Sequence, residues 1–545
     1  MRIAAIFLLF IIAHSSYGQV EHVTVAHPVY NYLIRMETRG MLPHFSSSVL
    51  PLQRKDIMNA LSKIESNKDE LSNSEKAILD RYLIEFEITN SHTAVNRKNA
   101  VVIYSPSDST QVFSREMIGE KEKFIYYYRD SVNKVNISPL GSLESLFSDD
   151  DNVILGNLGV RLYGSLGEHF GYYLQATNGA VISGNRDLAL REIHKLKQNV
   201  KFADLNSDFD FSESHIRFDY EWFYAILGHE TRLVGSGIAN RLFISPNAPP
   251  GDALTLGAKF NNFEYRYSHT SILAADQANY IAGFNTEFPD KYLVTHRFAL
   301  KPAWGEISFW EGIIYSKRGI DLAYLSPLSF FKSLEHALHD RDNSLMGGDI
   351  TIRPIDRIQL KGSFLLDDIK FGEIGKGYWS NKTAWNLGIM YASPLNIDFA
   401  VEYARVEPYT FTHFDSINSY TNDEMLIGTG LLPNSDETSF ILRYWWGNRY
   451  PVSLKVSYMR HGSNIYADDG TLERNVGGNP FQTRRPEDSE TVTFLDGDLQ
   501  EGWNYELIAG WEIVRGFNIK VKYISRESAG DWQNVYFISF GFEDF

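Results

Sequence analysis

A chain of 545 residues without cysteine forms no disulfide bonds, so hydrogen bonding and packing must supply its stability. Its formal net charge of −16 argues against a nucleic-acid partner, because nucleic-acid-binding surfaces are basic. Beyond the first 18 residues, no apolar run is long enough to form a membrane-spanning helix.

The N-terminus has the features of a secretory signal peptide. Met1-Arg2 is a positively charged start, residues 3–13 are apolar, and Ser16-Tyr17-Gly18 places small residues at the cleavage spacing. We therefore assign residues 1–18 as a signal peptide that is cleaved before Gln19.

Residues 19 to about 87 show helical periodicity, and we assign residues 19–95 as a helical bundle. Helices are expected over residues 28–40 and 54–64, and a capping box of Ser72 and Glu75 precedes a third amphipathic segment. Three short helices would form a small bundle on the periplasmic side. This bundle is either a freestanding domain or a plug under the rest of the chain.

The end of the chain shows the strand pattern most clearly. Residues 503–513, 517–523 and 536–542 alternate apolar with mostly polar side chains, as expected for strands with one apolar face. Strands of roughly 10 residues cross a bilayer when they are tilted. The chain ends on Phe545, and a terminal aromatic strand is a signal for outer-membrane barrel assembly machinery.

Short and long connections alternate along residues 96–545. Short turns are predicted at residues 166–169, 220–222, 261–262, 301–303, 354–356, 392–395, 447–451 and 514–516. Longer polar segments lie between them, at about residues 178–211, 232–252, 273–291, 315–345, 368–382, 406–436 and 461–500. In outer-membrane barrels the short turns are periplasmic and the long loops extracellular.

About seventeen strands follow from Asn152 onward, and an even-numbered barrel requires one more from residues 124–129 or 134–138. The sequence therefore predicts an all-β transmembrane barrel of about 18 antiparallel strands with a small N-terminal α-helical bundle. Tryptophans near the strand ends agree with membrane-interface girdles. A soluble all-β protein is the weaker alternative, because its strands are usually shorter.

Searches for catalytic and metal motifs give no strong candidate. Glu335, His336, His339 and Asp340 could ligate a metal, but such a set more often forms the solvated face of a loop helix. Residues 148–152 could hold calcium, but a solvated acidic loop is the simpler interpretation. We predict no metal, no cofactor and no enzymatic activity.

Several stretches, taken in order, resemble a known family. They are Ala26-His27-Pro28-Val29-Tyr30, Pro51-Leu52-Gln53-Arg54-Lys55-Asp56-Ile57, Leu242-Phe243-Ile244-Ser245-Pro246-Asn247-Ala248-Pro249-Pro250, Leu325-Ser326-Pro327-Leu328-Ser329-Phe330-Phe331, Glu335-His336 and Asp342-Asn343-Ser344-Leu345-Met346-Gly347-Gly348-Asp349. Together they resemble the capsule assembly protein Wzi family over nearly the whole mature chain.

This resemblance implies an outer-membrane barrel with a periplasmic helical bundle. It further implies a surface lectin that attaches exported capsular or extracellular polysaccharide to the cell. The implied partners are this polysaccharide, outer-membrane lipid and the barrel assembly machinery, with the protein as a monomer. Two alternatives stay open. One is a porin or transport channel, and the other is a barrel hydrolase built on His336, His339, Asp340 and Asp342.

The 315–345 loop is the predicted place for polysaccharide binding. An apolar helix over residues 326–338 would pack on the barrel lumen or a neighbouring loop and support a polar tail. Arg341 would meet a sugar carboxylate, and Asp342 and Asn343 would bond ring hydroxyls. Asn247 would add a contact if the two loops meet. Alternatively, Asp342 and Asn343 only cap the turn into the next strand.

Overall fold

The structure of the chain is a computed structural model that describes residues 19–86, 100–102, 119, 122–130, 132–204, 206–274 and 289–542. The assigned signal peptide, most of the predicted 273–291 loop and terminal Phe545 lie outside the described residues. No helix within the described ranges is long and apolar enough to cross a membrane.

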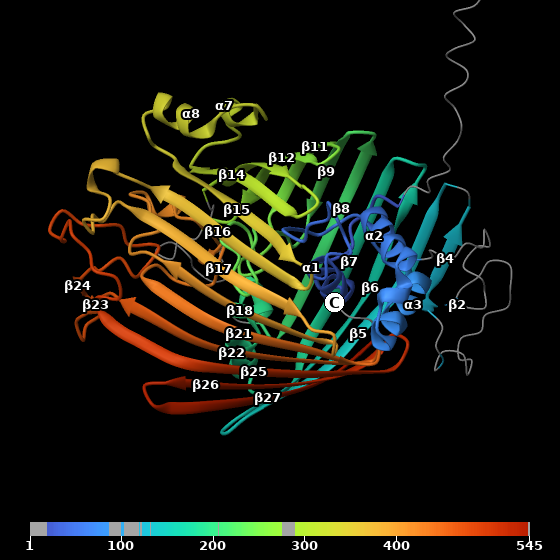
Figure 1. Cartoon of the computed structure of the whole chain (residues 1–545). Coiled ribbons are helices and arrows are strands. Elements are labelled where there is room, and N and C mark those ends of the chain that lie inside the picture. The colour runs from blue at the N-terminus through green and yellow to red at the C-terminus, as the bar shows by residue number, and fades with distance from the viewer. Residues whose placement is uncertain are drawn as a thin grey trace, which may run out of the picture.

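Among the described residues, eighteen antiparallel strands form one closed barrel (Figure 1). They are β5 (Lys134–Ser148), β6 (Asn152–Leu166), β7 (Phe170–Gly184), β8 (Asp208–Tyr220), β9 (Phe223–His229), β11 (Asp252–Phe260), β12 (Phe263–Ile272), β13 (Lys291–Leu300), β14 (Gly305–Ser316), β15 (Asn343–Ile355), β16 (Ile358–Asp368), β17 (Lys382–Ala392), β18 (Ile397–Val406), β21 (Ser435–Trp446), β22 (Tyr450–Ser463), β25 (Asp498–Val514), β26 (Phe517–Ser528) and β27 (Asp531–Phe542).

Pairing between β27 and β5 closes the ring, from Val535 opposite Ser148 to Phe542 opposite Gly141. The short strand β4 (Tyr126–Arg129) pairs only with the first residues of β5. The predicted fold and strand count are confirmed, and β5 is the strand that completes the even number.

The connections define two ends of the barrel. The predicted short turns join consecutive strands at one end, which we call the short-turn end. The opposite, long-loop end carries the longer segments. There the predicted alternation is wrong at two places. Residues 149–151 join β5 to β6 directly, and residues 529–530 join β26 to β27, because these strands continue to the turn.

The two faces of the barrel wall differ as the two-residue period predicts. On β27, Tyr536, Ile538 and Phe540 are exposed on the outer face, whereas Val535 and Phe537 are buried on the inner face. The outer face is therefore apolar and suited to lipid. The inner face packs against segments inside the barrel.

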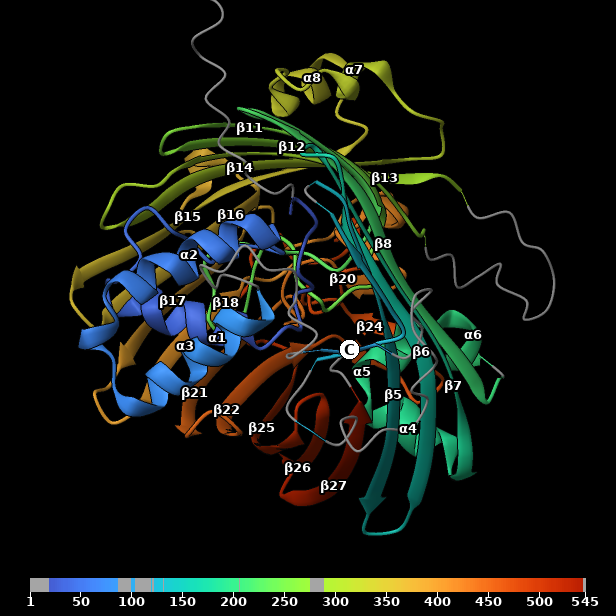
Figure 2. The ribbon, with the colours of Figure 1, turned by 90° about the vertical axis from the view of Figure 1, so that its right-hand side faces the viewer.

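Three helices lie at the short-turn end, toward which Figure 2 looks. They are α1 (Val29–Thr38), α2 (Arg54–Ser66) and α3 (Asn73–Glu85). The predicted capping box is present, since Ser72 Oγ accepts from Glu75 N at 3.2 Å and Glu75 Oε2 accepts from Ser72 N at 2.8 Å. The three helices share a buried apolar core.

The long loops carry further short elements. These are α4 (Arg186–Glu192), α5 (His194–Lys197), α6 (Val200–Asp204), α7 (Leu322–Leu325), α8 (Phe331–Ala337), β10 (Leu233–Val234), β19 (Thr421–Asn422), β20 (Met425–Leu426), β23 (Ile465–Tyr466) and β24 (Leu472–Arg474). Nearer the N-terminus lie β1 (Val49–Leu50), β2 (Ala100–Val102) and β3 (Glu122–Phe124).

The predicted helix over residues 326–338 is wrong in extent and in packing. Pro327 disfavours a helical Ser326, so α7 ends before the predicted segment and only α8 lies within it. Both helices pack on the outer wall of β12 to β14, neither in the lumen nor on a neighbouring loop (Figures 1 and 2).

Candidate functional site

The lumen is entered from the short-turn end by α1. Its Ile34 packs against Met390 and Ala400, which face inward from β17 and β18. Arg35 donates to the carboxylate of Asp398, and its Nη2 donates to Ser393 O at 2.7 Å. These contacts fix the first helix to the inside of the wall at the β17–β18 turn.

A carboxylate at the start of α3 joins the helices together. Glu75 accepts from Arg35 Nε at 2.9 Å and from Arg39 Nη1 at 2.8 Å. Burial alone would raise the pKa of Glu75, but the Ser72 N–H and the two guanidinium groups hold this pKa below its usual value. The helices are thus cross-linked by charge at the place where they meet the barrel.

From the long-loop end, residues 230–251 fold into the lumen, and we call this segment the inner loop. Its backbone is irregular, yet wall side chains accept its N–H groups. Glu402 on β18 accepts from the backbone N of residues 238, 239 and 240 at 2.5, 3.1 and 2.7 Å. The ring of Phe243 stacks on the inward-facing Trp310 with centroids 4.7 Å apart.

The segments entering from the two ends bond to each other inside the barrel. β1 pairs with β10, with Val49 opposite Val234. Arg241 Nη1 donates to Ser48 O at 3.1 Å, and its Nη2 donates to Ser47 O at 3.2 Å. The N-terminal segment and the inner loop therefore form one continuous filling of the lumen.

A second long loop also folds inward. Leu188, Leu196 and Phe202 of α4 to α6 are buried against inward-facing residues such as Leu155. Arg526 Nη1 on β26 lies 2.7 Å from Glu192 Oε2. This loop fills the region beside β6 to β8 and β26 to β27.

Residues 407–434 bond to the inner loop and are joined to two further long loops, and we call residues 369–381, 407–434 and 464–497 the loop cap. Tyr409 N donates to Gly477 O at 2.8 Å, and Trp379 N donates to Glu490 O at 3.0 Å, so the three loops are joined by backbone bonds. The hydroxyl of Tyr420 donates to the carbonyl of Phe243 in the inner loop. The cap is therefore fixed to the filling beneath it.

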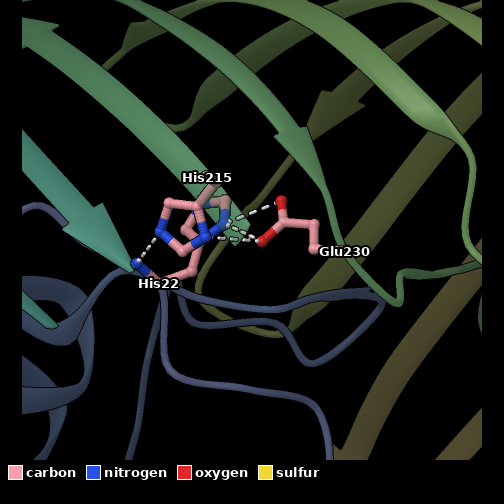
Figure 3. A group of neighbouring side chains, drawn as sticks. All are labelled: His22, His215 and Glu230. Carbon is pink, nitrogen blue, oxygen red and sulfur yellow. Dashed lines mark hydrogen bonds and ion pairs between the residues drawn. The ribbon is translucent and has the colours of Figure 1, made fainter. Parts of the chain in front are cut away.

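His22, His215 and Glu230 lie together inside the barrel, with both rings directed at the carboxylate (Figure 3). His22 Nδ1 lies 3.0 Å from both carboxylate oxygens, and His215 Nδ1 lies 3.1 Å from Oε2. Burial lowers the pKa of His22 to about 4, although Glu230 acts in the opposite direction. The cluster ties the N-terminal segment to β8 and to the inner loop.

The protons in this cluster are set by its outer contacts. Arg217 Nη1 donates to His22 Nε2 at 3.0 Å, and the His22 backbone N–H donates to His215 Nε2 at 3.0 Å. Both Nε2 atoms are acceptors, so both Nδ1 atoms carry protons. His22 Nδ1 donates to Glu230, whereas His215 Nδ1 lies close to the carboxylate without hydrogen-bond geometry. A metal ion at the carboxylate would need lone pairs on the Nδ1 atoms, so the arrangement fits a hydrogen-bonded cluster and not a metal site. Sequence reasoning missed it.

The predicted residues 341–343 are placed differently from one another. Asp342 is buried and accepts from Arg318 Nη2 at 2.6 Å and from Tyr324 Oη at 2.7 Å. Asn343 is also buried, and its Nδ2 donates to Asn418 O at 2.9 Å. Arg341 is half-exposed and lies 3.3 Å from Asp321. A ligand can therefore reach Arg341 without displacing buried contacts.

Asn247 lies in another part of the loop cluster. Its Nδ2 donates to Leu426 O at 2.7 Å, and its carbonyl accepts from Gln198 Nε2 at 3.1 Å. Asn247 and the 341–343 segment each contact residues 407–434, at Leu426 and Asn418 respectively. Among the described contacts no hydrogen bond joins them to each other.

The outer surface of the loop cap carries exposed aromatic rings on all three loops. Phe371, Phe414 and Tyr466 are 78%, 68% and 42% exposed. Half-exposed or more exposed cations accompany them at Lys376 and Arg474. Tyr466 Oη donates to Gln482 Oε1 at 2.9 Å, which fixes this ring. Large exposed apolar groups gathered on a surface mark binding sites, and each loop of the cap contributes one.

Comparison with known proteins supports the fold. No family model and no curated protein sequence matches the chain. One similar solved structure is that of Escherichia coli Wzi, described as an outer-membrane protein involved in group 1 capsule assembly and a carbohydrate-binding β-barrel. The TM-score is 0.58 at 12% identity, over 95% of this chain and 99% of Wzi. The chain thus has a Wzi-like outer-membrane barrel fold.

Two further solved structures give weaker similarity. Pseudomonas aeruginosa OprD aligns with a TM-score of 0.42 at 10% identity, over 75% of this chain and 94% of OprD. Acinetobacter baumannii OccAB2 aligns with a TM-score of 0.43 at 10% identity, over 75% and 97%. Scores this low carry no argument about function.

Proposed function

We propose that the protein is an outer-membrane lectin of the Wzi family, with the loop cap as its polysaccharide-binding surface. The single observation that carries this proposal is the loop cap itself, which presents exposed aromatic rings above a filled lumen. Aromatic faces pack on sugar rings, and cations pair with acidic sugars. In this proposal the protein binds glycan without cleaving it and holds exported capsular or extracellular polysaccharide on the cell.

The proposal includes an orientation. The long-loop end would face the medium and α1 to α3 the periplasm, with residues 19–95 and 96–545 as the two units of a monomer inserted by the barrel assembly machinery. Two segments bonded together inside the lumen favour this function over a porin or transport channel, because an aqueous pore needs an unfilled interior.

Removal of the three aromatic rings tests the proposal. In a triple Phe371→Ala, Phe414→Ala and Tyr466→Ala variant, polysaccharide affinity should fall roughly 10- to 100-fold, at about 0.5–1 kcal/mol per ring. Cells carrying it should shed polysaccharide into the medium. The matched control removes three exposed apolar side chains from the short-turn end, Leu166, Leu395 and Trp446. Equal retention by both folded triple variants would contradict the proposal.

Charged residues provide a second arm. Arg341→Ala with Arg474→Ala should weaken binding of an acidic polysaccharide and reduce the salt dependence of that binding. Binding of a neutral polysaccharide should not change. The readout is affinity of the purified protein at two salt concentrations.

A further inference from the structure

The outer wall of β14 carries side chains that are unusual for a lipid-facing strand. The outward positions are Ile307, Phe309, Glu311, Ile313 and Tyr315, in steps of two. The first two are exposed, and the last three are buried. An ionisable group on the lipid face of a barrel is destabilising, so Glu311 needs cover.

Residues 317–342 provide that cover, and we call them the outer clasp. Lys332 N donates to Glu311 Oε1 at 2.8 Å, and the ring of Phe331 lies 3.9 Å from the ring of His296. The carbonyl of Tyr324 accepts from Tyr267 Oη at 2.8 Å. The clasp thus bonds outward polar groups of β12 and β14 and packs an aromatic ring on His296 of β13.

Several apolar side chains of the clasp are exposed and do not pack on the barrel wall. Leu322 and Leu328 are 80% and 85% exposed. Ile320, Leu325 and Phe330 are also exposed, and we call these five side chains the clasp ridge. Figures 1 and 2 both place α7 and α8 outside the barrel ring. Five large exposed apolar side chains in one short segment mark an interface.

The height of the outer wall of β14 that the clasp leaves uncovered indicates what covers the ridge. From Gly305 at the short-turn end to Glu311, β14 rises about 20 Å along the strand, or about 15 Å across the membrane at a tilt near 40°. The apolar band of an outer-membrane barrel is about 25 Å tall. The uncovered wall is therefore too short to form the whole apolar band, and the ridge supplies the part of the band nearest the long loops.

We propose that residues 320–338 of the outer clasp, which include α7 and α8, lie within the leaflet nearest the long loops and that the clasp ridge contacts the acyl chains of the surrounding lipid. The clasp covers the outward positions of β14 that directly follow the exposed Ile307 and Phe309. Helical turns suit this location, because they satisfy much of their own backbone hydrogen bonding away from water. This inference is independent of glycan binding.

The absence of cysteine allows a site-specific test. A Leu328→Cys variant of the full chain carries an environment-sensitive fluorophore and is reconstituted in phosphatidylcholine vesicles with or without brominated acyl chains. Matched labels are placed at Ile538 on the lipid-facing wall and at Asp468 on the loop cap, both exposed. The Leu328 label should lose fluorescence in brominated lipid as strongly as the Ile538 label. The Asp468 label should respond only to aqueous iodide.

Two outcomes would overturn the inference. A Leu328 label quenched by iodide and unaffected by brominated chains would place the ridge in water. A label shielded from both quenchers would indicate a protein partner, such as a second copy of the chain. Should Leu328→Cys not fold, Leu322→Cys repeats the test on the same ridge.

Discussion

The inner loop and the outer clasp are both long connections at the same end of the barrel, yet they fold onto opposite faces of the wall. The inner loop is irregular and reaches the N-terminal segment inside the lumen. The outer clasp forms two short helices and covers the outside of β12 to β14. The chemistry of the wall explains the difference.

Inward-facing side chains can replace the hydrogen bonds that an irregular backbone lacks. Ser363 Oγ accepts from Ser236 N at 3.1 Å. Glu402 accepts from the N–H groups of residues 238, 239 and 240. The outer wall offers mainly apolar side chains, so a segment placed there satisfies much of its backbone within its own turns. Irregular backbone is thus found where a polar wall meets it.

The largest expected effect follows from emptying the lumen. One variant lacks residues 19–86 and has residues 236–248 replaced by a short Gly-Ser linker. Its conductance should exceed that of the intact protein roughly tenfold or more, because an eighteen-stranded barrel is wide enough for an aqueous pore. Replacing residues 320–338 of the outer clasp should leave conductance unchanged. Planar-bilayer recording measures both. An equal rise in both variants would contradict the distinction between the loops.

The carboxylate that holds the inner loop should matter next. Glu402→Ala leaves three N–H groups without an acceptor and should lower the local opening free energy of the inner loop by roughly 3–5 kcal/mol. Glu402→Gln keeps one acceptor oxygen and should cost less. Amide hydrogen exchange of residues 236–242 measures the difference. Unchanged exchange in Glu402→Ala would show that packing alone holds the loop.

The cluster of His22, His215 and Glu230 should weaken in acid. The pKa of His22 is about 4 in the folded protein and 6.5 when exposed, so the unfolded segment binds more protons between these values. Stabilisation is therefore complete above pH 6.5 and falls by up to about 3 kcal/mol as the pH drops toward 4. Protease cleavage within residues 19–27 should rise over this range.

Two variants sharpen that experiment. His22→Gln should remove most of the pH dependence of cleavage, because the titrating group is gone. His44→Gln, at an exposed histidine of the same N-terminal region, should retain it. A wild-type protein cleaved equally at pH 7 and pH 4.5 would exclude His22 as the titrating group.

The smallest expected effect lies in the outer clasp. Tyr324→Phe removes the hydroxyl that donates to Asp342 at 2.7 Å while Arg318 still pairs with this carboxylate. Local stability of residues 317–342 should fall by about 1 kcal/mol, and that of the inner loop should not change. Hydrogen exchange of both segments in one sample gives the comparison. Coupled loosening of the two would argue that they act as one unit.

The sequence predicts the local elements well, because neighbouring residues determine them. The turn at residues 261–262 and the capping box at Ser72 and Glu75 depend on side chains a few positions apart. Strand alternation likewise follows from single segments, which is how the strand count emerges. The barrel therefore follows from many local patterns that agree.

Contacts inside the barrel could not be predicted in this way. Glu402 is 164 residues from Ile238, and Glu230 is 208 residues from His22, so no spacing links them. The 341–343 segment was predicted to face ligand, but the sequence does not reveal that Arg318 and Tyr324 would engage Asp342. One sequence signal could have predicted the outer clasp, since Glu311 interrupts the apolar outer face of β14.

The conductance of the intact protein tests the central claim most directly. If the N-terminal segment and the inner loop fill the lumen and leave the loop cap as the working surface, the full-length protein in a planar bilayer should give no steps above background. Stable, large conductance steps from the intact protein would contradict the account and favour a channel.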